Sequence, residues 1–193
     1  MNIGRFTQGQ RKAAGLALAL IASLACSAVV AAPPPHAGAC VIGAPGCKHQ
    51  PHRLMYPAHA LSFGNGGFSL HPRGVNWANN NGAMTLTLRR PLDYDGGDVT
   101  VTLFYQLTSD EIGDITFHIT PVTMHHGSGF ETYGAVASNT VVASGDPTMV
   151  LEQSAVIPPG NGFSPDGDWW YLEIGREGTY NLGLRMMSVA IDY

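Results

Sequence analysis

The sequence is poor in charged residues, and basic residues are the scarcer kind. Charged side chains make up 12% of the 193 residues, with ten Lys and Arg against fourteen Asp and Glu. A chain with this balance has no basic surface with which to hold DNA, RNA or anionic lipid. We therefore expect no nucleic-acid partner.

Long apolar runs are absent after the N-terminal region. Three basic residues precede the apolar run 13–25, and small residues then lead to Ala31. This order is typical of a secretory signal peptide, and the run is too short to span a bilayer. We expect a bacterial signal peptide over residues 1–31, a secreted or periplasmic protein, and no membrane span. Lipidation at Cys26 is a less well supported alternative, because Ser23 stands where a lipobox has an apolar residue.

Removal of the leader makes the chain more acidic and leaves it only two of its three cysteines. Seven basic residues then face fourteen acidic ones, a net charge of −7. The remaining Cys40 and Cys47 enclose six residues, and an even pair this close in an oxidising compartment predicts a disulfide.

No segment has a sustained helical stripe, and no repeat indicates a solenoid or propeller. Apolar residues instead recur at every second position in 99–107 and again in 115–120, which predicts an antiparallel hairpin. Residues 32–58 form a Pro-, His- and Cys-rich arm, and 124–133 read as a loop. Over 59–193 we expect an all-β fold, an antiparallel β-sandwich of eight or nine strands.

Three aromatic residues are candidates for a glycan-binding surface. Alternation puts Trp169 and Tyr171 on one face of their strand, and Tyr180 follows in the next loop. Trp170 shares the other face with Leu172 and predicts a core position. Exposed rings could stack against sugars, but aromatics of this kind are more often core or subunit-interface residues.

Two clusters have residue types that bind metals. The side chains of His49, His52 and His59 suit copper or zinc, although a solvated His-rich arm explains the same residues. Asp93, Asp95 and Asp98 place hard oxygen ligands in one turn, as calcium requires. A glycine-rich hairpin turn explains this second cluster without a metal.

The sequence contains no coherent catalytic group, although it does not decide whether the protein is an enzyme. Ser128 lies near two histidines but lacks the strand and helix of a nucleophile elbow. Carboxylates such as Glu131 and Glu152 have no spacing that predicts glycoside hydrolysis.

Several spacing patterns in the second half of the chain resemble a known group of domains. They are 97–101, 113–117, Ile157-Pro158, Trp170-x-Leu172-x-Ile174-x-Arg176 and 189–193. Their order resembles the small β-sandwich domains of phage and prophage virion appendage proteins and of uncharacterised secreted bacterial proteins. The resemblance spans residues 75–193 and implies a jelly-roll-like sandwich, often trimeric, that acts in structure or attachment. It transfers no functional residue.

Three hypotheses follow. The first is a non-enzymatic secreted domain, structural or adhesive, either as a monomer or as a homo-oligomer. The second is a carbohydrate-binding module using the three aromatics. The third is a metal-binding or hydrolytic protein using the two clusters above.

Overall fold

Two antiparallel sheets account for nearly all the regular structure of this computed structural model, which describes residues 52–127, 131–143 and 146–193. Sheet A contains, in order, β10 (Leu151–Ile157), β6 (Val99–Leu107), β12 (Leu184–Asp192), β4 (Gly74–Trp77) and β3 (Phe68–His71), and β1 (Arg53–Pro57) also pairs with β12. Sheet B contains β2 (Ser62–Phe63), β5 (Ala83–Arg89), β11 (Trp169–Glu177), β7 (Gly113–Met124) and β8 (Glu131–Tyr133), and β9 (Ala137–Ala143) also pairs with β7. One 3-10 turn, η1 (Ala58–Ala60), is the only helical element among these residues.

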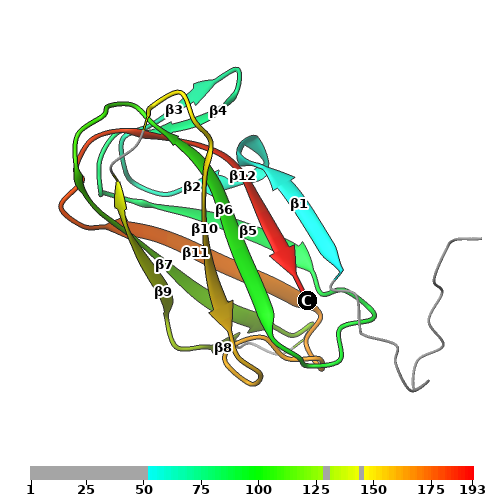
Figure 1. The fold of residues 1–193 in the computed structure, drawn as a ribbon. Helices are drawn as coiled ribbons and strands as arrows, with labels where there is room; N and C mark the ends of the chain where they lie inside the picture. The colour runs from blue at the N-terminus through cyan, green and yellow to red at the C-terminus, as the bar shows by residue number, and fades with distance from the viewer. Residues whose placement is uncertain (1–51, 128–130, 144–145) are drawn as a thin grey trace, which may run out of the picture. The chain divides into compact units, whose positions relative to one another are not determined.

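The two sheets form the layers of a sandwich. In Figure 1, β6, β10 and β12 cross in front of β5, β7 and β11. The predicted all-β, jelly-roll-like sandwich is therefore confirmed. The described residues contain twelve strands rather than eight or nine. Among the additional ones, β1 falls in the predicted arm and β8 in the predicted loop.

The predicted hairpin between residues 99–107 and 115–120 is wrong. β6 pairs with β10 and β12 in sheet A, whereas β7 pairs with β11, β8 and β9 in sheet B. The loop between β6 and β7 therefore connects the two layers. Alternation places one face of each strand in the core, and it does so equally for strands of one sheet and of two facing sheets.

The core lies between the inward faces of the sheets. Alternate residues of β6 and β7 expose at most 2% of their surface. They include Val99 and Leu103 on β6 and Phe117 on β7. Aromatic rings bridge the layers, since Tyr105 meets Phe117 edge to face with centroids 5.3 Å apart. Burial of these side chains is the main source of stability in such a fold.

The end of the predicted arm is part of the sandwich. β1 pairs with β12 along its whole length, and the Arg53 guanidinium donates two hydrogen bonds to Asp192, of 2.7 and 2.9 Å. The described residues belong to the compact unit His49–Tyr193. The predicted leader and disulfide, Cys40 with Cys47, lie outside the described residues and stay predictions.

One predicted turn requires its glycine. Gly82 ends the turn that begins at Asn79, and its φ is 80°. A Cβ at Gly82 would lie 1.9 Å from the carbonyl oxygen of Asn65, so the loop before β3 packs directly on this turn. Only glycine combines this φ with so close an approach.

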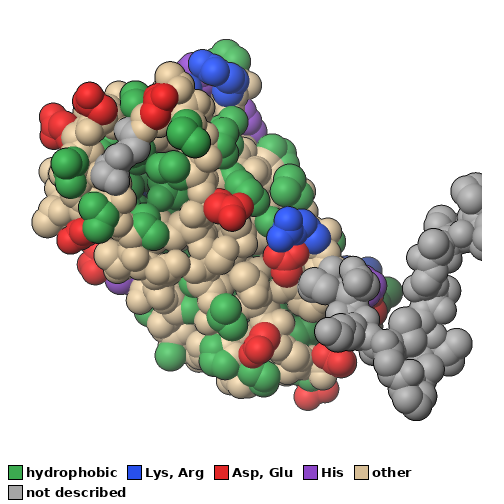
Figure 2. All heavy atoms as spheres, in the orientation of Figure 1, with side chains coloured by type: hydrophobic (Ala, Val, Ile, Leu, Met, Phe, Trp, Pro, Cys, Tyr) green, Lys and Arg blue, Asp and Glu red, His purple; other side chains and the backbone are tan. Residues whose placement is uncertain are grey.

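The outward faces of the two sheets differ in character. The face drawn in Figure 2 lies over sheet A, and its charged and hydrophobic side chains are scattered among polar groups and backbone. The outward face of sheet B, in contrast, has a hollow.

None of the helical segments in the described part of the chain has the length and apolar character to traverse a bilayer.

Candidate functional site

The central strand of sheet B separates two kinds of residue. On β11, Trp170, Leu172 and Ile174 are completely buried, whereas Trp169 is 45% exposed. Tyr171 and Glu173 share the outward side with Trp169. The predicted core position of Trp170 is thus confirmed, and Trp169 and Tyr171 face away from the core.

The strand register aligns outward residues into a row across four strands. Tyr171 lies opposite Thr87 on β5 and Val122 on β7, and Val122 in turn lies opposite Tyr133 on β8. Since neighbouring strands are about 4.8 Å apart, the backbones of Tyr171 and Tyr133 are roughly 10 Å apart.

A second row of outward residues crosses the sheet two positions away from the Tyr171 row along each strand. In it, Trp169 is opposite Arg89 on β5 and Met124 on β7. Two residues of a strand span about 7 Å, so Trp169 flanks the Tyr171 row. The outward face thus carries three aromatic side chains from two strands within a short distance.

A hollow of about 320 Å³ lies on this face. Its lining consists of Thr87, Val122, Met124, Tyr133, Tyr171 and Glu173. Val122 is 1% exposed and lies at the base, whereas Tyr133 is 62% exposed. Concave sites of this size, lined by apolar and aromatic side chains with a few polar groups, are typical of small-ligand binding.

Glu173 is the only charged residue among the described residues of the lining. It is exposed, and no Lys, Arg or His of the described residues lies within ion-pair distance of its carboxylate. An ionised carboxylate only accepts hydrogen bonds, so Glu173 is available to hydroxyl donors of a ligand.

The rest of the face is mainly polar, although Val142 on β9 is exposed on it, and it has a gap in the middle. The Nε2 of His118 lies 2.8 Å from the carboxylate of Glu177, and Thr116 hydrogen-bonds Thr140 at 2.7 Å. Gly175 lies between Glu173 and Glu177 and has no side chain. A Cβ there would meet nothing nearer than the Cβ of His118 at 3.9 Å, so packing does not require the glycine.

Tyr180 does not belong to this surface. It is 2% exposed, and its hydroxyl donates to the carbonyl oxygens of Ser109, at 3.3 Å, and Gly183, at 3.4 Å. The prediction that Tyr180 binds a ligand is therefore wrong, because its ring closes one end of the core. A tyrosine in a loop cannot be assigned to either surface by strand alternation.

One pair of predicted metal ligands is brought together, but the two residues bind each other. His52 lies 3.2 Å from the Asp93 carboxylate and stacks on Tyr193, whose hydroxyl donates to Asp93 at 3.1 Å. Burial and this hydrogen bond raise the pKa of Tyr193. The cluster fastens the start of the described chain to its C-terminal strand.

The other predicted ligands are dispersed. The imidazole Nε2 of His59 lies 2.9 Å from the His71 carbonyl oxygen, and Asp95 accepts the Gly97 amide at 3.2 Å as an ordinary turn does. His49 lies outside the described residues. Among the described residues, no three His, Cys, Asp or Glu side chains lie close enough together to hold a metal ion. Asp98 therefore belongs to no such group. The described residues form no group of three or more ligands for copper, zinc or calcium, and a site that includes His49 stays a prediction.

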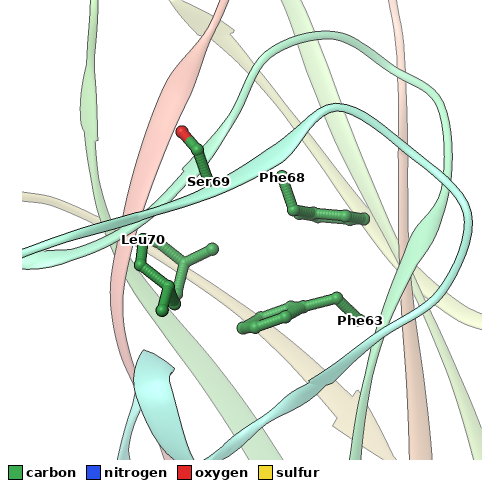
Figure 3. A pocket seen from close by; sticks show the side chains of 5 residues that line it. Phe63, Phe68, Ser69 and Leu70 are labelled. Carbon is green, nitrogen blue, oxygen red and sulfur yellow. The ribbon is translucent and has the colours of Figure 1, made fainter.

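A second hollow, of about 160 Å³, lies where β2 and β3 meet at the edges of the two sheets. Figure 3 shows the rings of Phe63 and Phe68 facing each other beside Leu70, while the Ser69 hydroxyl points away. The two rings stack with centroids 5.4 Å apart. The ring of Phe68 also packs against Trp77 in the core, with centroids 5.2 Å apart. This hollow lacks the hydrogen-bonding groups of the first.

Sequence reasoning missed Tyr133 and Glu173. Tyr133 lies in β8, a strand of three residues that is too short for its alternation to stand out from a loop. Glu173 could have been found, because it shares the outward parity of Trp169 and Tyr171.

No family model and no curated protein matches the sequence. Among solved structures, the chain is similar to the xylan-binding module CBM15, at 12% identity and a TM-score of 0.48, over 74% of this chain and 97% of that one. It is also similar to the CBM36-1 domain of a multidomain xylanase from the hindgut metagenome of Trinervitermes trinervoides, at 14% identity and a TM-score of 0.46, over 72% and 96%. A CBM36 module in complex with calcium and xylotriose gives 6% identity and a TM-score of 0.41, over 70% and 97%.

These findings correct two predictions from the sequence. The first hypothesis, a structural or adhesive domain, does not agree with the names of these three solved structures, which are carbohydrate-binding modules. At 6–14% identity they bear on the fold of the chain and not on its role. The resemblance to phage appendage proteins is likewise not supported. The sandwich fold that this resemblance implied is present in the chain itself.

Proposed function

We propose that the chain is a carbohydrate-binding module whose ligand lies in the hollow on the outward face of sheet B. The observation that carries this proposal is one hollow that combines aromatic rings with hydrogen-bonding groups. Tyr171 and Tyr133 supply the rings, and Glu173 and Thr87 supply the polar groups.

This combination suits the chemistry of a sugar. A pyranose ring has C–H faces that pack on aromatic rings, and a rim of hydroxyls that need hydrogen-bond partners. Aromatic side chains provide large apolar surfaces, and a few polar groups around them fix the orientation of a ligand. Trp169 extends the apolar surface beyond the hollow by one row.

The alternative occupants of such a surface fit less well. A filled core does not account for Trp169 and Tyr133, which are 45% and 62% exposed. A subunit interface over the same residues would bury Glu173 without an ion-pair partner from the described chain. Burial of an uncompensated carboxylate is strongly unfavourable, and charged residues are depleted from interface centres.

Calorimetric titration with xylopentaose and cellopentaose tests the proposal. We expect one of these neutral oligosaccharides to bind, and Tyr171→Ala and Tyr133→Ala each to weaken binding about tenfold or more. Loss of a stacked aromatic ring costs roughly 1–2 kcal/mol of binding free energy.

Phe104→Ala is the matched control. Phe104 is a half-buried aromatic residue on the outward face of sheet A, opposite Glu152. Its loss should leave the affinity unchanged. No binding of either oligosaccharide, or equal binding by the tyrosine variants and the wild type, would contradict the proposal.

We also infer that the chain is exported, since a module for extracellular polysaccharide acts outside the cytoplasm. The order of basic, apolar and small residues in 1–31 supports this inference. Mass spectrometry of protein recovered after export should give a chain that begins at Ala32, with Cys40 and Cys47 protected from thiol labelling. Recovery of the uncleaved chain would contradict export.

A further inference from the structure

We infer that the hollow selects neutral glycans and discriminates against uronic acids at the sugar that contacts Glu173. This inference rests on the proposed function and adds the substrate class. Glu173 is the only charged residue among the six described residues that line the hollow, and it is an acid.

The surroundings of Glu173 do not supply a compensating cation. The other charged residues on the outward face of sheet B with described side chains are Arg89, Asp114, His118 and Glu177. His118 is engaged by Glu177 at 2.8 Å, and Arg89 lies opposite Trp169, two rows away from Glu173 along the strands. Four residues of a strand span about 13 Å, which exceeds the screening length of roughly 8 Å at physiological salt.

Two effects then act against an acidic sugar in the hollow. A uronate carboxylate accepts hydrogen bonds but donates none, so it cannot replace a hydroxyl as a donor to Glu173. It also brings a second negative charge within a few ångströms of the first. Like charges at about 4 Å in a hydrated site repel by an amount that corresponds to roughly fivefold in affinity. A neutral sugar meets neither penalty.

The test compares oligosaccharides that differ only in their carboxylates. One pair is a β-1,4-linked oligoglucuronate and the cello-oligosaccharide obtained by reducing its carboxyl groups. The other is a xylo-oligosaccharide with glucuronic acid side groups and the same oligosaccharide after those carboxyl groups have been reduced. Affinities of the wild type, Glu173→Gln and Glu177→Gln are measured by calorimetry at low and at high salt.

We expect the neutral member of the pair that binds to bind at least about fivefold more tightly than its acidic counterpart. Glu173→Gln should bring this ratio close to one, since glutamine keeps the shape and can donate a hydrogen bond. Glu177→Gln should change the ratio little, because Glu177 lies about 13 Å along β11 and is paired with His118. High salt should narrow the ratio of the wild type.

Equal binding of both members of a pair by the wild type would overturn the inference and leave the proposed function standing. Tighter binding of the acidic member would overturn it as well, and so would a ratio that Glu173→Gln does not change. Failure of both neutral oligosaccharides to bind would instead remove the proposed function, and the inference with it.

Discussion

The two sides of β11 have opposite roles, although their residues are neighbours in sequence. The inward side presents Trp170, Leu172 and Ile174, all completely buried. The outward side presents Tyr171 and Glu173, which line a hollow, and Trp169 one row beyond it. Trp169 and Trp170 are adjacent, yet one is 45% exposed and the other is stacked on Phe163 with centroids 4.4 Å apart.

Parity along the strand therefore assigns each residue of β11 to folding or to binding. Successive side chains of a strand point to opposite faces, so a shift of one residue in register would exchange the two sets. The core side holds the register because its side chains cannot be moved into water without a large loss of stability. The outward side is then free to carry residues that serve a ligand.

The largest expected effect follows from truncation on the core side. Trp170→Ala should lower the free energy of unfolding by about 3–5 kcal/mol, because it removes a fully buried indole and leaves a cavity. Urea denaturation followed by circular dichroism measures the change. A loss below about 1 kcal/mol would show that Trp170 is not a core residue.

A second effect on the core side depends on pH. Burial raises the pKa of Tyr105 to about 12, whereas the phenol in the unfolded chain titrates near 10. Between these values the unfolded state binds fewer protons, so stability falls as pH rises from about 10 to 12, by about 2–3 kcal/mol.

Tyr105→Phe should remove this part of the alkaline loss while the other tyrosines keep theirs. Denaturation curves for both proteins at pH 9, 10 and 11 measure it. An identical decline in the two proteins would contradict the assignment to Tyr105.

On the outward side, the effect should appear in binding and not in folding. Trp169→Ala should weaken binding of the neutral oligosaccharide by about tenfold, or about 1.4 kcal/mol. Its free energy of unfolding should change by less than about 1 kcal/mol, since surface substitutions are usually small in effect. A Trp169→Ala variant that unfolds as easily as Trp170→Ala would break the distinction between the two sides.

The smallest expected effect concerns the gap at Gly175. Gly175→Val should raise the free energy of unfolding by about 0.5–1 kcal/mol, because glycine weakens a strand interior and a Cβ has room there. Affinity for xylopentaose should stay the same, since Gly175 lies outside the lining of the hollow. A loss of affinity would extend the binding surface to this gap.

The sequence was sufficient for the fold class and for the parity of β11. Alternation predicted a sandwich, the burial of Trp170 and the outward position of Trp169, because a period of two is a direct consequence of strand geometry. It could not predict which strands pair. β6 and β7 bury alternate residues just as the strands of a hairpin would, although they belong to different sheets.

The site was only partly predictable for a related reason. Tyr171 and Trp169 lie on one long strand, but Tyr133 joins them through the pairing of β8 with β7, which depends on the tertiary register. Tyr180 has the same residue type and lies in a loop, where no periodicity indicates that it is buried. His52 and Asp93 are 41 positions apart in the sequence. They meet because both contact Tyr193, which directly follows β12.

Ligand should bind on the side of β11 that carries Trp169 and not on the side that carries Trp170. The chain has three tryptophans, so its indole N–H signals in a ¹⁵N–¹H correlation spectrum can be assigned by single substitutions. Titration with the neutral oligosaccharide should shift the Trp169 signal progressively to saturation, while the signals of the buried Trp77 and Trp170 stay in place. An unchanged Trp169 signal at saturating ligand, or equal shifts of all three, would contradict the account.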